Sequence, residues 1–207
     1  MAEFSSLSNT AATSRRILRS ARALLAEKGE AGFSMRAVAE GAGVTVGAIY
    51  RHFEDRSALI ERVVIQAFES FELELTRAVL SQPVGSFARL VALGHKYMEF
   101  AQRHSEEFKI LYSPDGERRK LGSLPGRGGY DLLRQCIVEA MEAGQMRRGD
   151  PDLTAFFLWS RVHGIVMLLL ACDLSDEALS ADGELTPGRA FEITRELALH
   201  GVAVEHE

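Results

Sequence analysis

Apolar residues recur every three or four positions along most of this chain, which is the spacing of amphipathic helices. The first such run begins at Thr13 or Ser14, either of which suits an N-cap, and it ends before Gly29. Nowhere do apolar and polar residues alternate with the period of two that marks a half-buried strand. The sequence therefore predicts an all-α protein of about nine helices.

Capping and turn residues divide the rest of the chain. Residues 113–129 contain five glycines and two prolines and so have loop composition. Asp150 followed by Pro151 is a typical helix start, with a cap before proline at the first helical position. After the first run, helices are predicted from Ser34 to Gly43, over Val46–Phe53, from Asp55 or Ser57 to about Leu80, from Pro83 to Ala101, over Glu106–Tyr112, from Leu132 to Met141, from Pro151 to about Cys172 and over Gly188–His200.

Composition places the chain among soluble globular proteins, since 46% of its residues are hydrophobic and 26% are charged. The N-terminus has no basic start followed by an apolar core, so we expect no signal peptide and a cytoplasmic protein. The most apolar stretch, 155–172, is short for a membrane span and contains Arg161 and His163 in its middle. We expect it to be a buried helix of a bundle.

The charge is distributed unevenly. The net charge of −5 alone disfavours nucleic acid as a partner, but residues 1–62 hold nine Lys/Arg against seven Asp/Glu, and the remainder holds fifteen against twenty-two. A mildly basic N-terminal part followed by an acidic remainder permits DNA binding at one end of the protein. The two cysteines, Cys136 and Cys172, lie inside apolar helical runs and are expected to be buried thiols.

The most informative stretch is FSMRAVAEGAGVTVGAIYRHFEDR, residues 33–56. Two short helices joined by a glycine-containing turn form a helix-turn-helix. In the second helix only Ile49 and Phe53 have the character of buried anchors. Its leading end is small, with Gly47 following Val46, as a helix that enters the major groove requires. The segment is predicted to bind DNA.

This region resembles the DNA-binding region of the TetR (tetracycline repressor) family. The similar run is RRILRSARALLAEKGEAGFSMRAVAEGAGVTVGAIYRHFEDRSALI, and the resemblance covers about a quarter of the chain. The resemblance implies an all-helical fold, homodimerisation and binding to an operator that a ligand relieves. It implies a helix-turn-helix domain over 13–56 and a C-terminal ligand-binding and dimerisation domain over 57–207. Residues 1–12 are small and polar, and we expect them to form a flexible arm.

The resemblance also assigns roles to residues of the helix-turn-helix. Tyr50, His52 and Arg56 match positions that touch phosphates, although the family usually has lysine where Arg56 stands. Ser34 and Thr45 match hydroxyl caps that are able to bond phosphate, and Arg36 matches a position that reaches a base edge or the backbone. From their chemistry, Val46, Gly47 and Arg51 are candidates for base readout, because valine packs on a thymine methyl and arginine pairs with guanine.

Simpler interpretations of these residues stay open. Tyr50 is also compatible with a half-buried core tyrosine, since tyrosine often combines an apolar body with a hydrated hydroxyl. Arg51, Arg56 and His52 are also compatible with ordinary solvated surface positions.

In the C-terminal part, the resemblance implies a ligand cavity and a dimer interface. The candidate lining is rich in aromatic and thioether side chains, and the alternative for each is plain core. The lining candidates are Phe68, Phe71, Tyr97, Met98, Phe108, Tyr112, Phe156, Phe157 and Trp159, with His95, Gln135 and Arg161 as polar groups that would orient a ligand.

A second resemblance lies in residues 159–164, WSRVHG, which are similar to the Trp/His-Gly motif of one TetR subgroup. It implies that this helix and the last helix form a four-helix bundle with the same helices of a second chain. Gly164 would allow close approach, with His163, Met167 and Leu168 beside it. The alternative for His163 is a hydrogen-bonded core histidine.

Together these observations predict a ligand-responsive repressor that binds a palindromic operator. The partners expected are double-stranded DNA, a second copy of the chain and a small apolar or amphipathic effector. No catalytic set, metal spacing or cofactor motif is apparent, so no enzyme activity, metal or cofactor is expected. The alternatives are an activator or architectural DNA binder without an inducer, and a helical ligand-binding protein or enzyme with a vestigial DNA-binding module.

Overall fold

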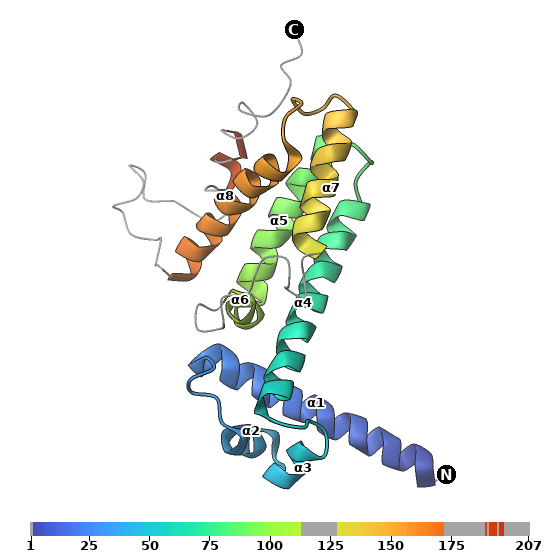
Figure 1. The fold of residues 1–207 in the computed structure, drawn as a ribbon, viewed down its shortest axis with the longest axis vertical. Coiled ribbons are helices and arrows are strands. Elements are labelled where there is room, and N and C mark those ends of the chain that lie inside the picture. The colour runs from blue at the N-terminus through green and yellow to red at the C-terminus, as the bar shows by residue number, and fades with distance from the viewer. Residues whose placement is uncertain (1, 113–127, 172–188, 190, 194, 197–207) are drawn as a thin grey trace. The chain divides into compact units, whose positions relative to one another are not determined.

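The protein is all-α, as predicted. The computed structural model describes residues 2–112, 128–171, 189, 191–193 and 195–196, and within them it contains helices and no strand (Figure 1). The helices are α1 (Ala2–Lys28), α2 (Met35–Ala42), α3 (Val46–Tyr50), α4 (Arg56–Leu80), α5 (Phe87–Arg103), α6 (Ser105–Leu111), α7 (Gly128–Glu142) and α8 (Pro151–Ala171).

The chain forms two compact units. The first unit comprises the residues up to Ser70 together with α6, and the second comprises Phe71–Arg103 and the residues from α7 onward. The predicted boundary after residue 56 differs from this division, because α4 is one continuous helix that contributes to both units. The described residues near the C-terminus, from 189 onward, fall within the predicted last helix, most of which lies outside the described residues.

Helix α1 is the longest element of the first unit. Ile17, Ala21 and Leu25 are buried along one face, and the hydroxyl of Ser20 donates to the backbone oxygen of Val38 in α2 at 3.0 Å. The expectation of a flexible arm over residues 1–12 is corrected, because α1 begins at Ala2. Residues 2–12 contain no proline or glycine that would end a helix, so the helical backbone continues past the predicted cap.

Local signals set the helix-turn-helix as predicted. The Oγ of Ser34 accepts from the N–H of Ala37, and the Oγ1 of Thr45 accepts from the N–H of Ala48, each at 3.2 Å. Gly43 ends α2 in the left-handed region, with φ of 62°. Helix α3 ends at Tyr50 rather than Phe53, and the backbone N–H groups of residues 52 and 53 both donate to Ile49 in the turn that follows.

Helices α4 and α6 complete the first unit. Asp55, one of the two predicted caps, accepts a hydrogen bond from the N–H of Ala58 at 2.8 Å at the start of α4. Helix α6 packs on α1, where Arg22 and Glu107 form an ion pair at 2.9 Å. Phe108 of α6 is fully buried.

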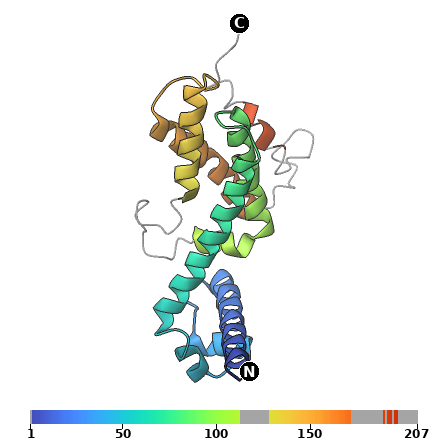
Figure 2. The same cartoon turned by 90° about the vertical axis from the view of Figure 1, so that its right-hand side faces the viewer.

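In the second unit, α5 contacts both α7 and α8, which also contact each other (Figure 2). The one buried charged side chain among the described residues is Arg89, which is 7% exposed. Its Nη1 lies 2.9 Å from a carboxylate oxygen of Glu139, and its Nε donates to the backbone oxygen of Gln82 at 3.2 Å. Helices α5 and α7 are thereby held to the turn before α5.

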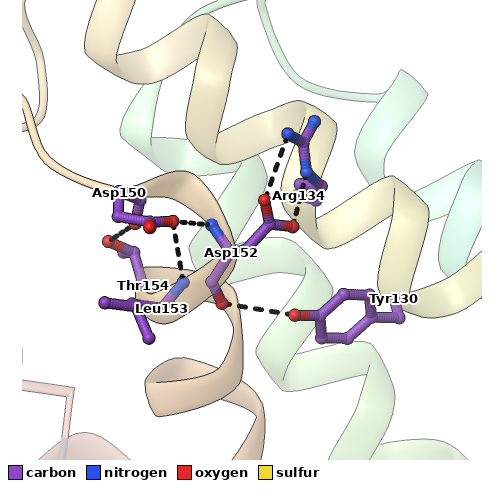
Figure 3. A network of polar contacts seen from close by, with 6 residues as sticks. All are labelled: Tyr130, Arg134, Asp150, Asp152, Leu153 and Thr154. Atoms are coloured by element: carbon purple, nitrogen blue, oxygen red, sulfur yellow. Dashed lines mark hydrogen bonds and ion pairs between the residues drawn. The ribbon is translucent and has the colours of Figure 1, made fainter.

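Polar contacts fix the start of α8 against α7 (Figure 3). Asp150 accepts from the N–H groups of Asp152 and Leu153, which confirms the predicted cap. Arg134 of α7 donates to both carboxylate oxygens of Asp152, at 2.7 and 3.3 Å. Tyr130 adds a bond from its hydroxyl to the backbone oxygen of Asp152 at 3.2 Å. Helix α7 begins at residue 128, inside the predicted loop.

A residue from the end of the chain also packs on α5. The ring of Phe191 is buried and occupies the space beside Gly94, where an added Cβ would lie 2.8 Å from the ring. His95 lies next to it, with Nε2 3.3 Å from a carboxylate oxygen of Glu192. A larger residue at position 94 would therefore have to displace this ring.

The expectation that residues 155–172 form a buried helix is corrected. In α8 only Ala155 and Val166 are buried, and just 11% of its most apolar 18-residue window is buried. By length and composition α8 is apolar enough to cross a membrane, a test that core helices of soluble proteins also pass. Five large apolar side chains of α8 are instead exposed in the described part of the chain, namely Leu153, Phe156, Phe157, Met167 and Leu168.

Candidate DNA interface and effector site

Helix α3 turns one face into the first unit and the other outward. Ile49 is completely buried and Ala48 is buried with it, whereas the side chain of Tyr50 is 53% exposed. Arg51 and Gly47 are also exposed. The predicted outward orientation of Tyr50 and Arg51 is confirmed, and Ile49 is the buried anchor that was predicted. The second predicted anchor, Phe53, lies after the end of α3 and is half-buried.

The leading end of α3 is thin. A Cβ added to Gly47 would meet only the Oγ1 of Thr45, at 4.0 Å. Val46 is half-buried and Thr45 is exposed. A helix that presents a glycine to open space at this point brings its backbone close to a flat or grooved partner.

The remaining polar candidates lie around α3. Arg36 and Ser34 are exposed at the start of α2, and His52 is half-buried after α3. The oxygens of Ser34 and Thr45 cap their helices as acceptors, so each hydroxyl keeps its own proton for donation to an anion.

Arg56 has contacts that the sequence did not predict. Its Nε donates to the backbone oxygen of Phe33 at 3.3 Å, and its Nη2 donates to the backbone oxygen of Glu30. The guanidinium also lies over the Phe33 ring, 5.5 Å from the centroid. The predicted phosphate contact of Arg56 stays a prediction, while its observed contacts join α4 to the turn before α2.

We expect Arg56→Ala to lower the free energy of unfolding by about 2 kcal/mol. The substitution removes the two hydrogen bonds that the charged guanidinium donates, and it leaves two backbone carbonyls without that donor. Urea denaturation followed by circular dichroism measures the change. Arg36→Ala is the control and should shift stability by less than about 0.5 kcal/mol, since Arg36 is exposed. Equal effects of the two substitutions would contradict a structural role for Arg56.

Several candidate effector-binding residues meet in the second unit. Phe71 contacts Tyr97 and Phe100 edge-on, with centroid separations of 5.4 and 4.9 Å. The hydroxyl of Tyr97 lies 2.8 Å from Nδ1 of His163, and Trp159 lies against the same imidazole, with ring centroids 5.6 Å apart. Burial lowers the pKa of His163, so this imidazole is neutral at neutral pH. Met98, the neighbour of Tyr97, is buried.

Other predicted lining residues are not part of this cluster. Phe68, Phe108 and Tyr112 belong to the first unit. Gln135 is exposed and donates to Glu139 at 2.9 Å. Phe156 is 57% exposed on the outer face of α8, so the expectation that it lines a cavity of this chain is corrected. Its helical position is displaced from the inward residues of α8, Ala155 and Val166.

The neighbourhood of the buried cysteine gives no sign of a reactive thiol. Burial raises the pKa of Cys136 to about 11, so it stays protonated at neutral pH. Cys172 lies outside the described residues. Among those that the structure describes, no three His, Cys, Asp or Glu residues gather as a metal ion would require.

Two family descriptions match this chain. "Bacterial regulatory proteins, tetR family" matches residues 17–63, and "Tetracyclin repressor-like, C-terminal domain" matches residues 90–187. The first match contains the whole helix-turn-helix, from α2 through α3 to the start of α4. The chain belongs to the TetR family. It is a transcriptional regulator with a DNA-binding helix-turn-helix.

Relatives agree with this TetR-family assignment. The HTH-type transcriptional regulator UidR of Escherichia coli (strain K12) is 25% identical over 183 residues, covering 83% of this chain and 88% of UidR. The probable acrEF/envCD operon repressor of the same strain is 29% identical over 163 residues, covering 74% of each chain. AibR, solved in complex with isovaleryl coenzyme A and operator DNA, has the same fold, with a TM-score of 0.69, 21% identity and coverage of 89% of this chain and 97% of AibR.

In this TetR-family chain the predicted dimerisation residues separate into two groups. His163 points to Tyr97 inside its own unit, as the alternative of a hydrogen-bonded core histidine predicted. Gly164, by contrast, has no atom within 4 Å of an added Cβ, and Met167 and Leu168 are exposed. The assignment of this C-terminal region to the Trp/His-Gly subgroup stays a prediction.

The exposed apolar face of α8 extends beyond the predicted dimerisation residues, back to Leu153 near the start of the helix. Helical spacing places six exposed residues and the half-buried Gly164 on one stripe, in which small side chains in the middle separate larger apolar ones at both ends. This outer stripe consists of Leu153, Phe156, Phe157, Ser160, Gly164, Met167 and Leu168. The recurrence at intervals of three and four was available in the sequence, but α8 is apolar on its other sides as well, which obscured it.

Proposed function

We propose that this chain is a ligand-responsive repressor that binds a near-palindromic operator as a homodimer in the cytoplasm. The observation that carries the proposal is the outward face of α3, with Gly47, Tyr50 and Arg51 exposed over the buried Ile49. A recognition helix of this kind reads base edges in the major groove. The relative named as an operon repressor supports repression as the mode of action.

We assign the DNA contacts in two groups. Val46, Gly47 and Arg51 are proposed to meet base edges, because they lie on the leading and outward parts of α3. Side chains around α3 are proposed to bind phosphates, which position the helix without reading sequence. The proposed phosphate-binding residues are Ser34, Arg36, Thr45, Tyr50 and His52. Arg56 mainly holds the turn before α2 in place.

Dimerisation is proposed to cover the outer stripe of α8. A monomer with Phe156, Phe157 and Leu168 exposed would carry a continuous apolar surface of the kind that marks protein interfaces. Ser160 and Gly164, one turn apart, allow two such helices to cross closely. A dimer with a two-fold axis offers two α3 helices to two half-sites roughly 34 Å apart, or a multiple of that spacing.

An effector is proposed to bind in the second unit beside the cluster of Phe71, Tyr97, Trp159 and His163. Aromatic walls with a few polar groups are typical of small-molecule sites. The neutral imidazole and the tyrosine hydroxyl give such a site polar atoms without a net charge, which suits an apolar or amphipathic ligand. The ligand would release DNA to the extent that it prefers the conformation with lower DNA affinity.

Selection of bound fragments from sheared genomic DNA, followed by sequencing, tests this proposal. We expect enrichment of inverted repeats whose half-sites are separated by whole turns of the duplex. Failure to enrich any sequence, even at low salt, would overturn the proposal and favour a ligand-binding protein with a vestigial module. A reporter driven by the selected site distinguishes repression from activation.

A further inference from the structure

Helix α1 carries most of the positive charge of the N-terminal region. Residues 4–26 contain four arginines and no aspartate or glutamate, whereas residues 27–62, which include the helix-turn-helix, contain five Lys/Arg and six Asp/Glu. The helix-turn-helix itself, residues 33–56, contains three arginines and three acidic residues, so it supplies no net attraction for a polyanion. The basic character of this end of the chain comes from α1.

Three of the four arginines are available to an external partner. Arg22 is engaged by Glu107 of α6, at 2.9 Å. The other three, Arg15, Arg16 and Arg19, are exposed on α1 and form no ion pair with any residue in the described ranges. They lie on either side of the buried Ile17 and Leu18 in the sequence. The side chains that α1 buries leave these three arginines on the opposite side, within a sector of about 100°. We call this the arginine face of α1.

The arginine face borders the helix-turn-helix. Arg16 stands one turn before Ser20, the residue that is hydrogen-bonded to α2. Within the first unit, the middle of α1, which carries these arginines, lies next to α2 and α3 in Figure 1, and α1 packs on α2. The arginine face is therefore adjacent to the element that is proposed to sit on DNA.

We infer that the arginine face of α1, formed by Arg15, Arg16 and Arg19, is a second DNA-contacting surface that binds the phosphates flanking the bases met by α3. This inference rests on the proposed function, because it requires α3 to be seated on DNA. Guanidinium groups bind phosphate oxygens in a bidentate geometry, and such contacts are independent of base sequence. Each phosphate neutralised releases counterions, so these contacts make binding salt-dependent.

The test is the double substitution Arg15→Gln/Arg16→Gln, measured by fluorescence anisotropy on two duplexes of equal length. One duplex is enriched from a random library by the wild-type protein, and the other has an unrelated sequence. We expect the affinity for both duplexes to fall at least tenfold. The slope of log K against log salt concentration should become shallower by about 0.9 for each phosphate that the variant no longer neutralises.

Arg147→Gln/Arg148→Gln is the matched control, because these residues are also an adjacent pair of exposed arginines but belong to the second unit. It changes the net charge equally and should leave both the affinity and the slope as in the wild type. Arg15→Lys/Arg16→Lys keeps the charge and should keep the slope, which guards against an effect of misfolding.

Two results would overturn the inference and leave the proposed function intact. One is an unchanged slope for Arg15→Gln/Arg16→Gln while substitutions in α3 abolish binding. The other is an equally large decrease in affinity for the control pair, which would show that only net charge matters. Failure of the proposed function is recognised separately, because the wild-type protein would then enrich no sequence.

Discussion

Substitution of Gly47 by phenylalanine is expected to lower operator affinity at least 100-fold while the protein remains folded. An added Cβ at this position meets only Thr45, so the ring would extend outward from the leading end of α3. It would hold the helix backbone away from the base edges, and the hydrogen bonds of the groove could not form. A 100-fold decrease corresponds to about 2.7 kcal/mol. Anisotropy titration measures the affinity and thermal melting the fold.

Two companion variants make the test specific. Gly47→Ala adds only one methyl group and should retain most of the affinity. Gly149→Phe places the same ring at another exposed glycine with open surroundings, in the turn before α8, and should bind DNA as the wild type does. Wild-type affinity in Gly47→Phe would exclude α3 as the helix that enters the groove.

The second large effect is expected from Leu168→Glu, which should raise the dissociation constant of the dimer at least 100-fold. Leu168 is 57% exposed in the monomer and lies on the outer stripe of α8, so the proposed interface would bury the new carboxylate without a partner. Sedimentation velocity over a concentration series measures the shift. Operator affinity should fall as well, because a monomer engages one half-site only.

Leu80→Glu is the control for this variant. It introduces the same charge at a leucine that is 70% exposed at the end of α4, away from the outer stripe. It should remain dimeric. A dimer of unchanged stability in Leu168→Glu would show that α8 is not the interface.

The sequence predicted those features that depend on local interactions. Ser34, Gly43 and Thr45 could be assigned because a cap or a left-handed turn is determined by a residue and its immediate neighbours. The burial of Ile49 followed from its position among small and polar residues in a short helix. These same signals defined the outward face of α3.

The sequence did not predict features that depend on contacts between distant segments. The bonds of Arg56 to the carbonyls of Glu30 and Phe33 join positions more than twenty residues apart. Helix α8 is apolar on several sides, so its periodicity did not distinguish the buried face from the outer stripe. The packing of α6 against α1 was not predictable either, because the two helices are some eighty residues apart in the chain.

The ring of Phe191 has a consequence for the order in which the protein matures. It fills the space that Gly94 leaves on α5, although almost one hundred positions of chain separate the two residues. During synthesis, α5 emerges from the ribosome long before the aromatic group that covers it. The second unit therefore reaches its final packing only when nearly all of the polypeptide has been translated, and until then this patch of α5 is open to chaperones.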